Sequence, residues 1–223
     1  MEEVSPRVEE YLEAIHRLEE KFGVAKTSSL AEVLQVALGT VTNTVENLEK
    51  QGLIIHVPYK GIKLTEKGKK IALEVLRKHR LSERLLTDVL GVDWSKVHEV
   101  ACKLEHSLPD EILKPLEKVL GHPRTCPHGN PIPTSCGGIF EEASEPLLNL
   151  KHGEKGVIVK ITEEKEEILE HLKKIGFLPG NIVKVEEKTP VDNLIKVRVG
   201  DTETYLSFRL ASIVNVKKLE QRS

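Results

Sequence analysis

Apolar residues recur at helical spacing near the start of the chain, and three such runs follow one another. The first run is carried by Val8, Leu12, Ile15 and Leu18. Ser5 followed by Pro6 predicts the cap and the first turn of that helix. Two shorter runs, at about 27–34 and 40–51, each open with hydroxyl residues, and a break that contains Gly39 separates them. This order predicts a helix-turn-helix unit.

The pattern changes to short β-type runs after Gly52, which predicts the end of the third helix. Residues 53–57 and 62–64 predict two strands, and a turn is expected between them at 58–61. Three helices followed by a two-stranded wing make residues 1–72 a winged helix-turn-helix domain, a fold that binds DNA.

Residues 73–140 predict a helical middle domain. The helices expected there share apolar residues at helical spacing and cover about 65–90, 95–108 and the segment after Pro109. Thr65 is the expected cap of the long first helix, and Gly91 is its expected stop. Residues 121–138 are rich in proline and glycine and predict a loop. We assign residues 141–150 to a linker.

β-type runs dominate the remainder of the chain, so residues 151–223 predict a small β-barrel domain. The expected strands are 157–161, 182–186, 194–199, 204–206 and 213–216. One helix is expected among them at about 163–175. The predicted fold class is therefore α+β with several domains: a winged helix-turn-helix, a helical domain and a small barrel.

Acidic and basic residues nearly balance, with 33 Lys plus Arg against 35 Asp plus Glu in 223 residues. This balance argues against a generic polyanion binder. No run approaches the roughly 18 apolar residues of a membrane span, and the acidic start of the chain lacks the regions of a secretion signal. Three cysteines are too few for a disulfide framework. We therefore expect a globular cytoplasmic protein with no membrane partner.

Positive charge is concentrated in residues 60–84, which hold nine Lys or Arg against three Glu. Because phosphate neutralisation supplies most sequence-independent affinity for DNA, this segment is a candidate phosphate-contacting surface. A solvated helix face is the alternative explanation of the same charges.

Metal-ligand residue types gather on one face of the helix predicted at 95–108. On a helical wheel of about 100° per residue, an arc of roughly 100° holds four of them, namely His98, Cys102, Glu105 and His106. Apolar residues occupy a separate sector, so the helix can pack into a core and still present this ligand face. Two further pairs stand at helical spacing, His79 with Glu83 and Glu10 with Glu13.

Imidazole, thiolate and carboxylate in combination suit a borderline divalent ion of the first transition row, whereas calcium or magnesium prefers oxygen ligands alone. Iron(II), manganese(II), cobalt, nickel and zinc remain open on this ground. Any one of these residues alone is more simply an ordinary surface side chain, but so many on one arc favour a site. A cation that gathers Glu10 and Glu13 with Glu83 and Glu105 would also reposition the helix-turn-helix unit.

Motifs along nearly the whole chain resemble the diphtheria toxin repressor family of iron-dependent and manganese-dependent transcription regulators. The motifs are E-Y-L-E-A-I at 10–15, T-V-T-N-T-V at 40–45, L-T-E-K-G at 64–68, R-K-H-R-L-S-E-R-L-L at 77–86, V-H-E-V-A-C-K-L-E-H at 97–106 and P-H-G-N-P-I-P at 127–133. L-K-K-I-G-F-L-P-G at 172–180 resembles the SH3-like, or ferrous-transport-associated, module of that family. The resemblance implies that the C-terminal barrel is SH3-like.

The resemblance also implies two metal sites. The ancillary site is matched by His79, Glu83 and His98, with Glu164 and Glu167 of the helix expected at 163–175 as further carboxylates. The primary, activating site is matched by Glu10, Cys102, Glu105 and His106, with Glu13 close by. Cys102 is typical of iron-type members, whereas Glu10 and Glu13 resemble the manganese type. Iron(II) is favoured as the cofactor and manganese(II) competes, while cobalt, nickel or zinc are expected substitutes in vitro.

The helix that begins near Thr40 is expected to enter the major groove of double-stranded operator DNA. Its outward polar residues are Thr40, Thr42, Asn43 and Asn47. An amide side chain can pair with adenine, and hydroxyls can contact phosphate or bases; ordinary solvent-facing residues are the alternative. Lys60 and Lys63 on the wing are expected to contact phosphates.

The proline-rich loop carries Cys126, His128 and Cys136, with His122 nearby. A short Cys/His set can bind a structural zinc, but ten residues from one cysteine to the next is no standard finger spacing. We therefore expect an inert linker that packs without a ligand. Trp94 is expected to anchor a core or a dimer rather than to contact a ligand.

These features predict a dimeric repressor, not an enzyme, that binds operator DNA when iron(II) is plentiful and controls metal-uptake genes. Dimerisation is expected because two half-sites multiply specificity. The middle domain also has more apolar residues than its helices need: Val97, Leu104, Leu108, Leu113, Leu116 and Leu120. A manganese-responsive regulator is the alternative within the family. A hydrolytic metalloenzyme with Glu105 as general base, or a metal carrier that never contacts DNA, are competing classes.

Overall fold

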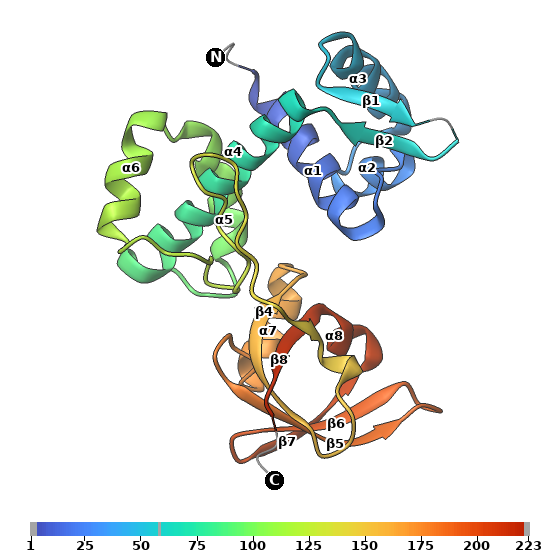
Figure 1. Cartoon of the computed structure of the whole chain (residues 1–223), viewed down its shortest axis with the longest axis vertical. Helices are drawn as coiled ribbons and strands as arrows, with labels where there is room; N and C mark the ends of the chain where they lie inside the picture. Colours follow the sequence, from blue (N-terminus) through green and yellow to red (C-terminus); the bar gives the residue numbers. More distant parts are fainter. Residues whose placement is uncertain (1–3, 58, 221–223) are drawn as a thin grey trace. The chain divides into compact units, whose positions relative to one another are not determined.

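The computed structural model describes residues 4–57 and 59–220. They fall into two compact units (Figure 1). Unit 1 holds the chain up to Lys78 together with Pro133–Gly138, and unit 2 holds His79–Ile132 together with the chain from Ile139 onward. The division lies inside one helix, and each unit has its own hydrophobic core. No helix among the described residues is both long and apolar enough to cross a membrane.

Unit 1 contains a winged helix-turn-helix, which confirms the fold predicted for the N-terminal segment. Its elements are α1 Pro6–Phe22, α2 Thr27–Val33, α3 Leu38–Lys50, β1 Ile54–Val57, β2 Gly61–Leu64 and the first part of α4 Glu66–Arg84. The two strands pair antiparallel, with Ile54 opposite Leu64 and Val57 opposite Gly61, and form the wing (Figure 1). Pro58, expected in the turn between them, lies outside the described residues.

The turn between α2 and α3 lies earlier than the sequence predicts. Gly39, expected in the break, is part of the first turn of α3. The chain instead changes direction at Gln35, whose φ of 53° is left-handed. Ala37 occupies the N-cap position of α3 and Ser5 that of α1, but neither makes a side-chain capping bond. Instead, the backbone carbonyl of each residue accepts hydrogen bonds from amides in the first turn of its helix.

The core of unit 1 forms from the apolar faces of the helices and the wing. Its largest fully buried side chains include Tyr11, Leu12, Ile15, Leu30, Leu48, Leu53, Ile54 and Ile62. α3 buries Val41, Val45 and Leu48, which share one face, so the opposite face is left to polar residues. Thr65 caps α4 as predicted, because its Oγ1 accepts a 3.1 Å hydrogen bond from the amide of Gly68.

The helical part of unit 2 begins with the second half of α4. It continues through the π turn Leu85–Val89, α5 Val97–Leu104, the 3-10 turn Glu105–Ser107 and α6 Asp110–Val119. The long helix α4 therefore ends in a π turn, and α5 ends in a 3-10 turn. Gly91 follows the π turn and has a left-handed φ of 69°. Leu86, Val97 and Ala101 form a small core between these elements.

The proline-rich loop is tied to both the helices and the sheet of unit 2, so it packs as predicted, while the absence of a ligand there stays a prediction. Arg84 on α4 donates from Nε to the carbonyl of Thr125 at 2.7 Å. The carbonyl of His128 accepts a 2.9 Å hydrogen bond from the amide of Ile161. Gly129, at a φ of 88°, lies so close to the sheet that a Cβ would overlap backbone atoms there.

The C-terminal part of unit 2 is a small six-stranded antiparallel sheet domain with two helices, as the predicted fold class requires. Its strands are β3 Glu145–Pro146, β4 Lys155–Ile161, β5 Ile182–Thr189, β6 Leu194–Val199, β7 Thr202–Ser207 and β8 Val214–Lys218, and they lie in the order β3-β8-β4-β5-β6-β7. The helices are α7 Glu166–Lys174 and α8 Phe208–Ile213. In Figure 1 both helices lie against the curved sheet.

Three details of this domain differ from the sequence prediction. Residues 145–150, assigned to a linker, form β3 and a 3-10 turn and bury Leu147 and Leu150 in the sheet core. The predicted helix begins only at Glu166, which leaves Glu164 in the turn after β4. α8 was not predicted, because six residues are too few for a helical repeat to stand out.

Gly68 lies where α4 approaches the wing, and a Cβ there would overlap the carbonyl oxygen of Leu53. We expect Gly68→Ala to lower the free energy of unfolding by about 1–3 kcal/mol, because the backbone must shift to make room. Urea unfolding of the full chain measures this. A Cβ at Gly39 in α3 meets nothing within 4 Å, so Gly39→Ala should leave stability unchanged or raise it by up to about 1 kcal/mol. Equal effects of the two substitutions would contradict the close approach.

Candidate metal centre

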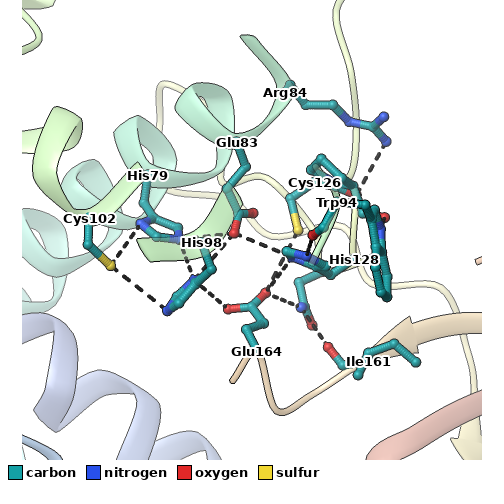
Figure 2. Close-up of polar contacts among 12 residues, drawn as sticks. His79, Glu83, Arg84, Trp94, His98, Cys102, Cys126, His128, Ile161 and Glu164 are labelled. Carbon is teal, nitrogen blue, oxygen red and sulfur yellow. Dashed lines mark hydrogen bonds and ion pairs between the residues drawn. The ribbon is translucent and has the colours of Figure 1, made fainter. Parts of the chain in front are cut away.

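The metal-ligating side chains of unit 2 come from four separate segments. These are α4 with His79 and Glu83, α5 with His98 and Cys102, the proline-rich loop with Cys126 and His128, and the turn after β4 with Glu164. On both helices the two residues are four apart and so project from one face. Figure 2 shows the seven side chains converging.

One cluster, called the ancillary cluster below, holds His79, Glu83, His98 and Glu164, whose ligand atoms all lie within 4.8 Å of one another. Glu83 Oε1 is 3.2 Å from His79 Nε2 and 3.3 Å from His98 Nδ1. Glu164 Oε2 is also 3.3 Å from His98 Nδ1. Glu83 has no exposed surface and His79 almost none. The structure therefore brings three residues of α4 and α5 together with a carboxylate from the sheet domain.

A second cluster, called the loop cluster below, holds Cys126 and His128 with the same two carboxylates, Glu83 and Glu164. His128 Nδ1 is 3.4 Å from Glu83 Oε1 and 3.5 Å from Glu164 Oε1. Cys126 Sγ is 3.9 Å from Glu164 Oε1. His128 Nε2 donates at 2.9 Å to the carbonyl of Trp94, which leaves Nδ1 facing the cluster.

Sequence spacing did not identify this loop cluster. It grouped Cys126 and His128 with Cys136 and His122, but Cys136 belongs to unit 1 and both it and His122 are exposed. The true neighbours, Glu83 and Glu164, are each more than thirty residues away along the chain. Nothing in local spacing signals such a group, because only the docking of the loop onto α4 and β4 assembles it. The half-buried Trp94 packs against the sheet core, as an anchor would.

A third group joins Cys102 to the two histidines of the ancillary cluster. Cys102 Sγ is 3.9 Å from His79 Nδ1 and 3.8 Å from His98 Nε2. His79 Nδ1 also lies 2.5 Å from Glu105 Oε2, and Glu105 Oε1 is 3.2 Å from His106 Nε2. The His79 ring therefore connects the ancillary cluster to Glu105 and His106.

Imidazole protons compensate the buried carboxylates of these clusters. Burial by itself lowers the pKa of His98 and His128, but neighbouring cysteine and glutamate side chains raise the two values to about 9 and about 12. Burial by itself raises the pKa of Glu83, yet His128 and His79 hold it well below its usual range. Burial raises the pKa of the Cys126 thiol to about 11, and the charge of Glu83 acts in the same direction. A cation that binds here must displace these protons.

The clusters fit a divalent cation of the first transition row. Glu83 Oε2 and His128 Nδ1 are buried without a hydrogen-bond partner among the described atoms, and such atoms are costly unless something pairs with them. Imidazole nitrogen, thiolate and carboxylate together form the donor set of iron(II), cobalt or zinc rather than of calcium or magnesium.

Five predicted ligands belong to none of the clusters formed by the described residues: Glu10, Glu13, Glu105, His106 and Glu167. Glu105 contacts both His106 and His79, but Glu105 and His106 form no ligand cluster with Cys102 among the described residues. Glu10 and Glu13 lie on α1 in unit 1, where Glu13 is paired with Arg17 at 2.7 Å. The assignment of Glu10, Glu13, Glu105 and His106 to a primary site, and of Glu167 to the ancillary site, stays a prediction.

The predicted DNA-contacting residues lie on the polar side of α3 and on the wing. Those with exposed side chains are Thr42, Asn43, Asn47, Lys60 and Lys63, while Thr40 is half-buried. Thr42 Oγ1 donates to the carbonyl of Leu38 at 3.1 Å, which holds it against the helix. The other exposed side chains are free to turn toward a partner.

The basic segment 60–84 is only in part a candidate phosphate-contacting surface. Three of its arginines bind backbone carbonyls of the proline-rich loop: Arg77 at Pro133, Arg80 at Pro131 and Arg84 at Thr125. These arginines hold the loop in place. The exposed lysines near the wing are what remains of the predicted surface.

A winged helix-turn-helix joined to a buried centre of His, Cys and Glu side chains defines the class of metal-dependent DNA-binding proteins. Family models agree with this class over most of the chain. They are the "iron dependent repressor, N-terminal DNA binding domain" at residues 3–62, the "iron dependent repressor, metal binding and dimerisation domain" at 65–134 and the "FeoA domain" at 145–218. The chain belongs to the iron-dependent repressor family.

Individual relatives also place the chain in the iron-dependent repressor family. The iron-dependent repressor IdeR of Mycobacterium leprae is 34% identical and is matched over 98% of this chain and 100% of its own length. The diphtheria toxin repressor of Corynebacterium glutamicum is 35% identical over 99% of this chain and 100% of its own.

Solved structures are similar to this protein over nearly all of the chain. A manganese-dependent transcriptional repressor in complex with manganese has a TM-score of 0.88 at 28% identity and covers 95% of this chain and 100% of its own. IdeR of T. acidophilum has a TM-score of 0.81 at 28% identity and covers 98% and 100%.

Asn130 positions Glu164, because its Nδ2 donates both to Glu164 Oε1 at 2.7 Å and to the carbonyl of Ile161 at 2.9 Å. We expect Asn130→Ala to weaken zinc binding to the full chain by about 10–100-fold, the usual effect of removing a group that orients a ligand. Competition against a chromophoric chelator measures this. Asn181→Ala removes a comparable amide bond, to the carbonyl of Gly176 on the surface, and should leave the affinity unchanged. Equal affinity of the Asn130 variant and the parent would contradict the positioning role.

Proposed function

We propose that this protein is a metal-dependent transcriptional repressor that binds operator DNA as a homodimer when loaded with iron(II), and that it controls genes of metal uptake and homeostasis. The observation that carries the proposal is the buried ancillary cluster, His79, Glu83, His98 and Glu164, in a chain whose α3 presents an exposed polar face. The relatives reported above are themselves named repressors, which supports regulation rather than catalysis.

The chain's own residues supply binding and orientation. When bound, the cation supplies positive charge that makes the approach of several carboxylates favourable. His79 and His98 offer imidazole nitrogens, and Glu83 and Glu164 offer carboxylate oxygens. Glu105 orients His79 by accepting from its Nδ1.

The activating site in this proposal consists of Cys102, Glu105 and His106 with Glu10, and Glu13 stands beside it. Its support is the contact chain in which Cys102 and Glu105 both meet the ring of His79, and Glu105 meets His106. Because Glu10 lies on α1, ligation by it would act on the unit that carries the DNA-binding helix. This is the switch that we propose.

Iron(II) is the proposed ion because the IdeR relative of Mycobacterium leprae is named an iron-dependent repressor and because thiolate ligands favour softer ions than manganese(II). A manganese(II)-responsive regulator is the second candidate, favoured by the manganese-dependent repressor whose fold superposes on the chain. The metal-free protein is titrated with each ion under anaerobic conditions, and its affinity for operator DNA is measured at each step. The ion that raises this affinity at the lower concentration is the one favoured.

Apolar side chains on the helical part of unit 2 support a homodimer. Those that remain exposed are Val89, Leu90, Val100, Ile112 and Val119. Two residues expected in the dimer contact, Val97 and Leu108, are instead buried within the unit. Exposed apolar side chains on the helical part of a regulator that binds two half-sites are typical of a subunit interface.

A metal carrier that never contacts DNA is the competing function, and a gel-shift titration separates the two. The DNA is a duplex selected from a random-sequence pool by the metal-loaded protein. Binding that appears with iron(II) or manganese(II), disappears with chelator and weakens steeply with salt supports the repressor. Metal uptake with no effect on DNA binding supports the carrier.

We expect His106→Ala to abolish metal-stimulated binding to the selected duplex while the chain stays folded. A coupling of about 1–3 kcal/mol corresponds to a loss of 5–150-fold in affinity. Gel shift with and without metal measures the loss, and far-UV circular dichroism reports the fold. The exposed His171 on α7 provides the control, since His171→Ala should behave as the parent. Metal dependence that persists in the His106 variant would refute the proposed activating site.

Lys63→Ala should weaken binding to specific and unrelated duplexes about equally, because a lysine on the wing contacts phosphates. The slope of log affinity against log salt should fall by about 1. Lys155→Ala, an exposed lysine of the sheet domain, is the matched control and should change neither quantity. A loss confined to one duplex sequence would show that Lys63 contacts bases instead.

A further inference from the structure

The wing is tied to α3 through the side chain of Glu49. Glu49 lies in the last turn of α3, and His56 lies in β1, the strand that follows it within unit 1 (Figure 1). Glu49 Oε1 accepts a 3.1 Å hydrogen bond from the backbone amide of His56. Glu49 Oε2 is 2.7 Å from His56 Nδ1. Both oxygens of the carboxylate therefore bind one residue of the wing.

The register of the wing explains why the His56 amide is available to α3. His56 stands opposite Ile62, and Ile62 exchanges its amide and carbonyl bonds with Ala25 on its other side. Opposite residues of an antiparallel ladder alternate between bonded and non-bonded pairs, so His56 and Ile62 form a non-bonded pair. The amide of His56 then points away from β2, and the Glu49 carboxylate accepts from this edge of the strand.

The contact joins two titratable side chains. Each of them is nearly half exposed. The hydrogen bonds from His56, first from its ring and then from its amide, hold the pKa of the Glu49 carboxyl below its usual range. Imidazole is the side chain that ordinarily changes its charge between pH 5 and 8. Two opposite charges therefore meet between α3 and the wing only while His56 is protonated.

Other charged side chains near the pair do not take part in it. Among the described residues, none of them binds Glu49 or His56 through its side chain. They lie on α3, on the wing and beside the Ala25 bridge, and they are Glu46, Lys50, Lys60, Lys63 and Lys26.

Sequence-specific binding of DNA places a demand on the angle between α3 and the wing. In the proposed function α3 reaches base edges, while Lys60 and Lys63 of the wing reach phosphates. Both sets of contacts form in one register only if the wing is held at a fixed angle to α3. Binding to an unrelated duplex uses phosphates alone and does not depend on that angle. A tie between α3 and the wing therefore acts on the ratio of the two affinities.

We propose that Glu49 and His56 position the wing relative to α3 for operator DNA, and that protonation of His56 strengthens this tie, so that specificity for the operator declines as pH rises. The proposal rests on the proposed function, because it requires α3 and the wing to bind DNA. His56 acts through Glu49 and is a positioning residue. A direct contact of its ring with phosphate would instead change binding to both kinds of duplex equally.

The test uses the full chain at saturating metal and measures its affinity for the selected duplex and for an unrelated duplex of equal length. The ratio of the two affinities, the specificity ratio, is followed from pH 6 to pH 8.5. It should fall by about 2–5-fold over this range, the scale of one exposed charged contact. A constant ratio would overturn the proposal.

Variants separate the tie from other effects of pH. His56→Asn is the conservative rescue, because the asparagine Nδ2 lies where His56 Nδ1 lies and donates at every pH. Its specificity ratio should stay at the parent's pH 6 value throughout, whereas His56→Ala should have the lower ratio at every pH. Glu49→Gln keeps an acceptor for the His56 amide but has no charge, so it should remove the pH dependence.

The exposed His171 on α7 provides the control for these variants. His171→Asn removes an imidazole outside unit 1 and should keep the parent's profile. A parental profile in His56→Asn or in Glu49→Gln would contradict the role of the pair. A parental ratio in His56→Ala at pH 6 would contradict it as well.

Hydrogen exchange of the metal-loaded chain reports the tie without DNA. Glu49→Ala leaves the His56 amide without its acceptor, so this amide should exchange faster than in the parent. The amide of Ile62 donates to Ala25 at 2.8 Å and should keep its rate, which shows that the wing stays folded. Unchanged exchange at His56 would overturn the tie itself.

Failure of this inference is distinguishable from failure of the proposed function. Metal-stimulated binding to the selected duplex with a specificity ratio that ignores pH refutes the role of Glu49 and His56 alone. DNA binding that ignores metal but keeps the pH profile and its loss in His56→Asn refutes the metal-dependent repressor and leaves the positioning role in place.

Discussion

Glu83 is a carboxylate with no exposed surface, and a buried charge persists only where other groups compensate it. Three histidines do so, at 3.2 to 3.4 Å from one of its oxygens. They come from α4, α5 and the proline-rich loop, so the compensation of one charge requires three segments to meet at one point. The same convergence suits a cation, because a cation would satisfy the carboxylate and the imidazoles together.

The proline-rich loop makes the sheet domain part of this centre. Arg84 holds the loop against α4, and Ile161 of β4 binds it from the other side. Gly129 permits the close approach to the sheet, since a side chain there would overlap its backbone. Asn130 then fixes Glu164, which would otherwise be an acidic residue in a surface turn. The C-terminal domain therefore contributes the Glu164 carboxylate to the cluster, and the proline-rich loop contributes the Asn130 side chain that holds it.

The division between the two units lies within α4, so this helix contributes residues to both. Its start packs on the wing through Gly68 and Leu53, and its last turns carry His79 and Glu83. The residues that pack on the wing and two residues of the ancillary cluster therefore belong to one continuous helix.

Local patterns predict the fold class, the helix-turn-helix with its wing, and the faces of α4 and α5 on which the His, Glu and Cys side chains gather, because helical periodicity and i, i+4 spacing are local properties. They misplace Gly39 and the start of α7, where packing rather than capping residues sets the boundary. Only the tertiary structure decided that Cys126 and His128 meet Glu83 and Glu164. Those contacts depend on how a loop without periodicity docks between a helix and a strand, and no local pattern encodes that docking.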